Sequence, residues 1–300
     1  MSQTVSISAA KPYGLTRVLV TWEISRSTYY WQRARQEDEG APVAKKRGPQ
    51  GPCDDRRLVG EIKGVLKASP FHGEGHRKVW VMLRFKGIRT SKARVLRLMG
   101  QEGLLAPTRL GNAHGPKAHD GTIRTERPHE MWGTDMTQTV TLAEGKAAVF
   151  ISVDHCTMEC TGIHAAAKGD RFEALEPINQ GVREQFGAIG AKRAQGLKIR
   201  HDHGSAYMAD HFQDQLKFLG MESSPSFVRE PEGNGCAEWF IRILKENLLW
   251  VRTFETIEEL RQALLEFKQR YNSTWLIARY GYQTPTAIRQ SLLGQQKAVA

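Results

Sequence analysis

The spacing of apolar residues changes from a helical period to a strand period part-way along the chain. In DDRRLVGEIKGVLKAS, Leu58, Ile62 and Leu66 recur every four residues, and two further helical patterns follow in RKVWVMLRFKG and SKARVLRLMGQEG. After residue 130 the period becomes two, in MWGTDMTQTV, KAAVFISVDH and TGIHAAAK. The pattern therefore predicts a helical first part and a second part that begins with three strands.

The rest of the second part alternates between helix and strand patterns. A helix is expected over residues 171–187, where Pro177 should kink or split it. A strand in GLKIRHDHG, a helix in ADHFQDQLKFLG, an extended piece in MESSPSF and an apolar helix in NGCAEWFIRILKENLLW follow. This order favours an α/β domain whose mixed sheet is covered by helices.

Segments without apolar period divide the chain into parts. Those rich in Gly, Pro and charge predict linkers. The expected organisation is a partial helix-turn-helix over 1–36, a linker over 37–54, a helix-turn-helix DNA-binding domain over 55–106, a basic linker over 107–127, an α/β core over 128–272 and a C-terminal tail over 273–300. The chain contains no run of about 18 apolar residues, and its start has no secretory pattern, so we expect a cytoplasmic protein without a membrane span.

Charge is distributed unevenly between the two parts. Residues 1–130 hold 24 Lys and Arg against 12 Asp and Glu, whereas residues 131–300 hold 19 against 20. A basic module joined to a near-neutral one indicates a nucleic-acid partner, although a basic surface can also serve solubility alone. Three helices with a tight turn before a basic last helix are typical of a DNA-reading helix-turn-helix; a module that binds protein is the alternative. The expected DNA contacts are Arg89, Lys92, Arg94 and Arg97.

Three acids stand where a carboxylate is unusual for structure alone. Asp135 lies within the first strand, where Asp is disfavoured, Asp202 closes the strand LKIR, and Glu238 opens the last apolar helix. If these acids converge, their mutual repulsion calls for a cation, and Mg²⁺ prefers oxygen ligands. Two such ions can promote phosphoryl transfer. Lys245 follows Glu238 by two helical turns and could hold DNA phosphate nearby.

Other residues offer competing interpretations. Asp154 ends the second strand and could be mistaken for a catalytic acid, whereas Glu230 and Glu232 are expected to be solvated. A zinc site built from Cys156 and Cys160 with the nearby histidines His155 and His164 is disfavoured, because this segment has the pattern of a strand.

The order and spacing of these motifs resemble a known family. With 35 residues between Asp202 and Glu238, the acids are similar to the DD(35)E pattern of retroviral-integrase-like transposases, and most similar to the second-reading-frame product of bacterial insertion sequences of the IS-three type. The resemblance covers nearly the whole chain and rests on the segments SRSTYYWQR, MWGTDMT, HDHGSAY, NGCAEWFIRILK and YNSTWLIARYGYQTPTAI. Ala206 stands where this family commonly has Gln, and TWLIARY replaces a common Arg-Pro-His run.

The resemblance implies a fold, an activity and partners. The fold would be an RNase H-like integrase catalytic core over 128–272, with a mixed five-stranded sheet and helices, preceded by all-α helix-turn-helix modules. The activity would be DNA transposition by 3′-end cleavage and strand transfer, with Asp135, Asp202 and Glu238 holding Mg²⁺, or Mn²⁺ in its place, as two ions. Partners would be double-stranded DNA at the transposon ends and target, further copies of the chain, and an upstream-reading-frame protein or fusion, in the bacterial cytoplasm at the nucleoid. A DNA-binding regulator with inert acids, an incomplete transposase product and a nuclease that does not join strands are the alternatives.

Overall fold

The computed structural model describes residues 3–37, 53–107, 125–226 and 234–299, and these form two compact units. The first unit is Met1–Gly51 and the second is Pro52–Ala300. The expected linkers over 37–54 and 107–127 fall almost entirely outside the described residues, as do Glu230 and Glu232.

The first unit contains two helices where the sequence predicts helical patterns. They are α1 (Leu15–Thr21) and α2 (Arg26–Glu37). The hydroxyl of Ser25 accepts the amide N–H of Thr28 at 3.1 Å and so caps the start of α2.

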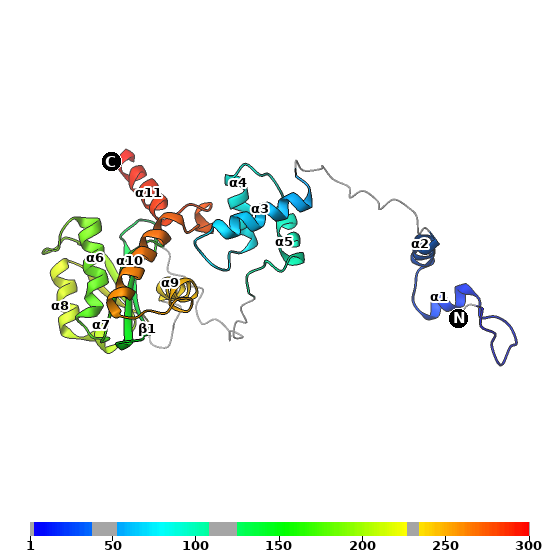
Figure 1. The fold of residues 1–300 in the computed structure, drawn as a ribbon, viewed down its shortest axis with the longest axis horizontal. Coiled ribbons are helices and arrows are strands. Elements are labelled where there is room, and N and C mark those ends of the chain that lie inside the picture. Colours follow the sequence, from blue (N-terminus) through cyan, green and yellow to red (C-terminus); the bar gives the residue numbers. More distant parts are fainter. Residues whose placement is uncertain (1–2, 38–52, 108–124, 227–233, 300) are drawn as a thin grey trace. The chain divides into compact units, whose positions relative to one another are not determined.

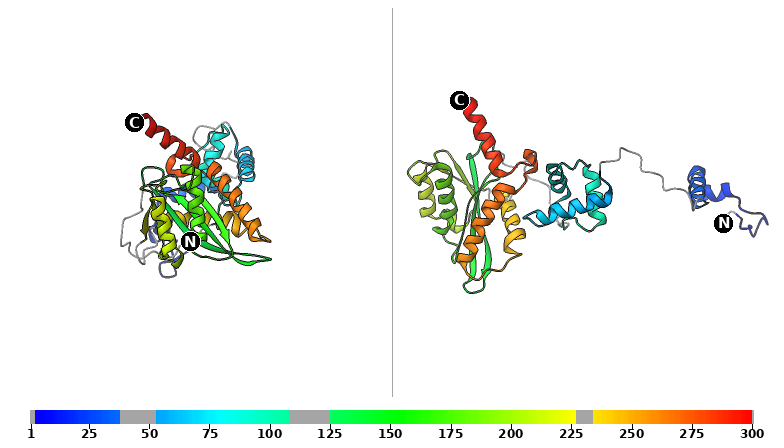
Figure 2. Two further views of the ribbon diagram at one scale, coloured as in Figure 1. Left: turned by 90° about the vertical axis from the view of Figure 1, so that its left-hand side faces the viewer. Right: turned by 45° about the horizontal axis from the view of Figure 1, so that its top comes forward.

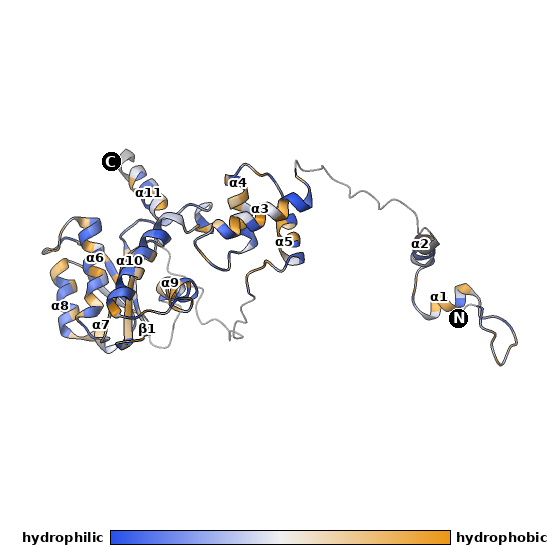
Figure 3. Ribbon diagram, in the orientation of Figure 1, coloured by the Kyte–Doolittle hydropathy of each residue, from blue (hydrophilic) through white to orange (hydrophobic). Residues whose placement is uncertain are grey.

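The second unit begins with three helices, which confirms the helical segments expected there (Figure 1). They are α3 (Asp55–Ala68), α4 (His76–Phe85) and α5 (Lys92–Gln101). Asp54 caps α3 by accepting the amide of Arg57 at 2.7 Å, and Ser91 caps α5. Apolar and polar residues alternate around these helices (Figure 3). Their apolar faces share one core: Leu58, Ile62, Val65, Val79, Leu83, Val95, Leu98 and Met99.

A mixed five-stranded sheet follows, which confirms the architecture expected for the second part. Its strands are β1 (Met131–Thr141), β2 (Gly145–Asp154), β3 (Cys160–Ala166), β4 (Lys198–His201) and β5 (Glu222–Pro225). Their order is β3-β2-β1-β4-β5. The pairs β1–β2 and β2–β3 are antiparallel, while β1–β4 and β4–β5 are parallel. The long strand β1 is therefore the central strand, and it carries Asp135.

Helices cover both faces of the sheet (Figures 1 and 2). Alternate residues of β2 point to opposite faces, so Val149 and Ile151 pack with α9 (Gly235–Leu244) and α10 (Ile257–Thr274), whereas Phe150 packs on the other side. That side holds α6 (Glu176–Phe186), α7 (Ser205–Met208) and α8 (Asp210–Leu219). The remaining elements are two 3₁₀ turns, η1 (Glu173–Leu175) and η4 (Ala278–Tyr280), a π-helical turn, η3 (Lys245–Leu249), and the last helix, α11 (Pro285–Val299).

The helix expected over 171–187 is split next to Pro177, as predicted. The segment begins as the 3₁₀ turn η1, and Pro177 then lies in the first turn of α6. Proline is tolerated there because the first amides of a helix have no partner within the helix.

The loop between α3 and α4 packs the three helices α3, α4 and α5 against the core beside the five-stranded sheet. Phe71 is 5% exposed and belongs to the core formed by α9, α10 and the sheet. Its ring meets Trp275 edge-on at 4.8 Å between centroids, and the amide of His72 donates to Asn247 at 2.7 Å.

Among the described helices, none is both long and apolar enough to cross a membrane.

Gly162 allows β3 and α6 to approach each other. A Cβ added at Gly162 would overlap the backbone carbonyl of Pro177. We expect Gly162→Ala to lower the free energy of unfolding by about 3 kcal/mol or more, because backbone atoms cannot move aside as a flexible side chain can.

Gly60→Ala is the matched control for Gly162→Ala. It adds the same methyl group in α3 with no atom within 4 Å, and we expect it to stabilise by about 0.5–1 kcal/mol. Urea denaturation of both variants checks these expectations. Equal effects would show that β3 and α6 do not depend on the missing Cβ.

Candidate active site

Asp135 lies in the middle of β1 at the position where charges from three other elements meet. It pairs with Ile151 of β2, and its Oδ1 accepts the amide of Met136 at 2.8 Å. Burial is the main cause that raises the pKa of Asp135 to about 6, and the negative charges of Asp202 and Glu238 act in the same direction. The Met136 amide and the positive charge of Lys245 act in the opposite direction. The structure thus brings together the acids and the lysine that the sequence singled out.

Asp202 is held in a tight turn just after β4. Its Oδ1 accepts the amide of Gly204 at 2.8 Å. The preceding residue, His201, is fully buried, and burial lowers its pKa, which favours the neutral ring. Its Nδ1 lies 2.6 Å from the carbonyl oxygen of Asp202, and its Nε2 lies 2.9 Å from the hydroxyl of Ser223 on β5. A neutral ring can donate to the carbonyl and accept from Ser223, so His201 supports the turn that presents Asp202.

Glu238 projects from the first turn of α9 and is exposed. Partial burial raises its pKa, and Arg242 one turn later lowers it. Lys245 begins the π-helical turn η3 that continues α9. The positive charge of Lys245 acts on Asp135, so the two residues lie close enough to interact electrostatically.

The three carboxylates are neighbours but do not form a single coordination sphere. Among the residues that the structure describes, no group of three or more His, Cys, Asp or Glu is close enough to hold a metal ion. The donors nevertheless suit a hard cation, because all three are carboxylates. Burial, with a smaller contribution from the neighbouring acids, raises the pKa of Asp135, and a nearby positive charge would favour its ionised form. The residues therefore fit a divalent cation, for which Asp135, Asp202 and Glu238 would be the ligands.

Asp154 has a structural role. Its carboxylate is 1% exposed and accepts the amides of Thr157 at 2.8 Å and His129 at 2.7 Å. These bonds close the turn between β2 and β3 and hold the chain before β1.

The residues of the zinc alternative have other surroundings. Cys156 and Cys160 are buried free thiols, and burial raises the pKa of each. His164 is instead paired with Glu173 at 2.7 Å.

The basic residues of α5 have different environments. Arg94 and Arg97 both contact the carboxylate of Asp55 at the start of α3, each at 2.7 Å, and they lower its pKa. Arg89 is exposed in the turn before α5, and the exposed Lys92 lies over the ring of Trp80 at 4.6 Å. Arg89 and Lys92 are therefore the more accessible candidates for contact with DNA.

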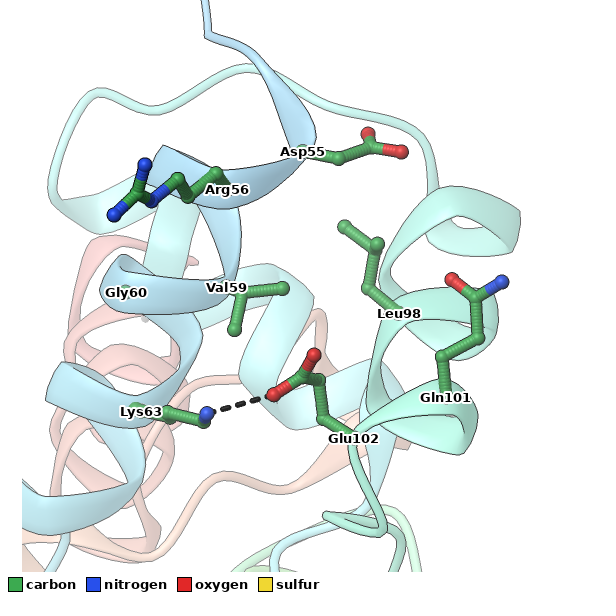
Figure 4. A pocket seen from close by; sticks show the side chains of 8 residues that line it. All are labelled: Asp55, Arg56, Val59, Gly60, Lys63, Leu98, Gln101 and Glu102. Atoms are coloured by element: carbon green, nitrogen blue, oxygen red, sulfur yellow. Dashed lines mark hydrogen bonds and ion pairs between the residues drawn. The ribbon is translucent and has the colours of Figure 1, made fainter.

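A pocket of about 540 Å³ lies between α3 and α5, away from the three acids (Figure 4). Lys63 and Glu102 form an ion pair of 2.7 Å at its side. Its lining residues are Asp55, Arg56, Val59, Gly60, Lys63, Leu98, Gln101 and Glu102. None of the three acids lines this pocket, so it does not contribute to the acid site.

Comparisons with known proteins give transposases as relatives. The transposase InsD of insertion element IS2A/D/F/H/I/K from Escherichia coli is 25% identical over 238 residues, which cover 77% of this chain and 78% of the relative. The transposase InsD of IS2-9 from strain K12 is also 25% identical, over 76% of its length. The chain is similar to insertion-sequence transposases. This similarity confirms the resemblance expected from the motifs; no family model matches.

The comparison with solved structures matches retroviral and transposon proteins. The simian T-cell lymphotropic virus intasome in complex with PP2A regulatory subunit B56 gamma is 16% identical with a TM-score of 0.46, and the match covers 70% of each chain. The catalytic core of BIV integrase is 18% identical with a TM-score of 0.42, over 56% of this chain and 99% of that one. The catalytic domain of Mos1 mariner transposase is 15% identical with a TM-score of 0.38, and the match covers 47% of this chain and 70% of that one.

The raised pKa of Asp135 predicts that this carboxylate destabilises the metal-free protein at neutral pH. A carboxyl group whose pKa is higher in the folded than in the unfolded chain costs stability once it ionises, so the cost is small near pH 4 and complete above about pH 6. We expect Asp135→Asn to stabilise the protein by about 2 kcal/mol at pH 7.5, and by much less at pH 4.

Urea denaturation in EDTA at several pH values measures this gain. Asp214→Asn is the control, because Asp214 is exposed and, among the described residues, forms an ion pair with Lys217. A gain for Asp135→Asn that does not change with pH would contradict the electrostatic explanation.

Proposed function

We propose that this chain is a DNA transposase that cleaves the 3′ ends of an insertion sequence and joins them to target DNA. The observation that carries the proposal is the convergence of Asp202, Glu238 and Lys245 on the buried carboxyl of Asp135. A structural domain gains nothing from three acids around one strand, whereas phosphoryl transfer uses such a set. The similarity to IS2 transposases supports the same reaction.

The acids would hold Mg²⁺, or Mn²⁺ in its place, as two ions, and Asp135 would contribute to both. Such ions lower the pKa of the attacking water or hydroxyl and stabilise the leaving oxygen. Support comes from the donor chemistry and from the repulsion between acids, which a divalent cation would offset.

Each side chain has a separate task in this proposal. Asp135 and Asp202 stand on or beside rigid strands and would set the geometry of the reacting phosphate. Glu238 is exposed on α9, so its side chain can adjust as substrate enters. Lys245, whose charge already acts on Asp135, would contact a DNA phosphate beside the acids.

The DNA ends would be bound by helical modules over 1–36 and 55–106, joined by the linkers over 37–54 and 107–127 to a catalytic core over 128–272 with a tail over 273–300. The caps and shared core of α3, α4 and α5 support a rigid DNA-binding module. Two ends must meet for joining, so we expect a homo-oligomer, with an upstream-reading-frame protein or fusion as a further partner. The protein would act in the bacterial cytoplasm at the nucleoid.

Replacement of Glu238 tests the catalytic proposal. We expect Glu238→Gln to reduce strand transfer at least 100-fold in Mg²⁺, because the amide keeps the shape of the side chain but not its charge. The assay uses labelled DNA from both flanks of the gene and compares Mg²⁺ with Ca²⁺. Glu266→Gln, at an exposed acid of α10, is the matched control and should retain activity.

The same assay separates the alternatives. Cleaved but unjoined products would favour a nuclease. Sequence-specific binding without cleavage by the chain, alone or as the upstream fusion, would favour a DNA-binding regulator.

The exposure of Arg89 and Lys92 predicts which basic residues matter for DNA. We expect Arg89→Ala and Lys92→Ala each to weaken binding to terminal DNA. Each should also reduce the slope of the logarithm of the binding constant against the logarithm of the salt concentration by about 1, which corresponds to one lost phosphate contact. Lys67→Ala, at the exposed end of α3, is the control. Affinity measured from low to moderate salt tests this, and an unchanged slope in both variants would place the DNA elsewhere.

A further inference from the structure

Asn234 occupies the N-cap position of α9 but does not cap that helix. An N-cap Asn usually accepts an amide N–H from the first turn with its side-chain oxygen. Here the side chain makes no such bond. Instead its Nδ2 donates to the backbone carbonyl of Thr134 at 3.0 Å, and Asn234 is only 5% exposed. The side chain is used for a tertiary contact with β1.

The contact reaches β1 at the residue before Asp135. The last β1–β4 pair is Gly133 with Arg200, so Thr134 lies where the two strands stop pairing. Glu238 follows Asn234 by four residues, which corresponds to one helical turn and a rise of about 6 Å. One hydrogen bond therefore connects the backbone next to Asp135 with the turn that carries Glu238.

Gly133 makes room for this contact. A Cβ at Gly133 would lie 2.9 Å from Oδ1 of Asn234 and 2.8 Å from Nε2 of His155. Any larger residue would displace Asn234 or His155 from the strand. The WGTD motif thus supplies Asp135, and its glycine leaves room beside the strand for the Asn234 side chain at the start of α9.

Stability alone does not account for Asn234. Its Oδ1 is buried and has no hydrogen-bond partner among the described residues, and an unsatisfied buried oxygen costs free energy. Its cost offsets much of what the bond to Thr134 contributes.

We propose that Asn234 is a positioning residue that sets the separation between Asp135 and Glu238 and thereby the affinity of the acid site for a divalent cation. The inference rests on the proposed function, because it assumes that the three acids bind the cation. Residues that orient metal ligands from the next layer typically change metal affinity 10–100-fold when replaced. In this chain the layer consists of Asn234, the carbonyl of Thr134 and the space at Gly133.

Binding of Mn²⁺ alone to the full chain tests this inference without any reaction. The free Mn²⁺ signal in an electron paramagnetic resonance titration gives the dissociation constant, and Glu238→Gln defines binding outside the acid site. We expect Asn234→Ala to raise the dissociation constant at least tenfold, with little change in the thermal midpoint in EDTA. Asn234→Leu, which keeps the approximate size but has neither donor nor charge, should behave in the same way.

Asn247→Ala is the matched control. Asn247 is a second buried Asn on the same helical segment, bonded to the amide of His72 and the carbonyl of Ile243. Its loss should lower the thermal midpoint and leave Mn²⁺ affinity within about twofold of wild type. This pattern is the reverse of that expected for Asn234→Ala.

Gly133→Ala tests the same anchor from the strand side and remains informative if an Asn234 variant fails to fold. Gly133→Ala should also raise the Mn²⁺ dissociation constant. The Gly133→Ala/Asn234→Ala double variant should bind Mn²⁺ no more weakly than the single variant with the larger dissociation constant, because both substitutions break the same contact. Wild-type affinity in Asn234→Ala or in Gly133→Ala would overturn the positioning role alone. Absence of Mn²⁺ binding that depends on Glu238 in the wild type would overturn the metal site of the proposed function, and the inference with it.

Discussion

The repulsion between carboxylates around a buried strand position is the constraint on which the candidate site depends. Asp135 must be ionised to bind a cation, yet burial and the charges of Asp202 and Glu238 oppose its ionisation. The fold opposes this repulsion with the amide of Met136 and the ammonium group of Lys245. The raised pKa corresponds to a free-energy cost of ionising Asp135 in the folded chain, which a bound cation would offset.

Rigid supports hold two of the three acids, and a looser one holds the third. Asp135 is fixed by the central strand, and Asp202 by a turn in which His201 is bonded on both ring nitrogens. Glu238 stands on a helix that contacts β1 through Asn234, and its carboxylate remains exposed. This distribution fits a site that is completed when cation and DNA arrive, because a preformed cluster of three acids would repel itself.

The sheet domain and the helical module before it are stabilised by different means. Close approach at small residues joins the sheet to its helices: Gly162 faces Pro177, and Gly181 faces the ring of Trp132. In the helical module, Asp55 holds two arginines of α5 and thereby fixes the last helix to the first. Arg94 and Arg97 therefore stabilise the module, and Arg89 and Lys92 retain the exposure that a phosphate contact requires.

Period in the sequence predicted the main elements, and the acids stay a prediction as catalytic residues. The change from a helical period to a period of two predicted the three helices and the strands, because each pattern can bury its apolar side in only one kind of structure. Asp135 stood out because strands disfavour Asp, and Asp202, Glu238 and Lys245 because of their spacing. The bond from Asn234 to Thr134, the pairing of Arg94 and Arg97 with Asp55 and the burial of Asp154 were decided by tertiary structure. These contacts join residues 25 to 100 positions apart, and local sequence does not determine which distant groups will meet.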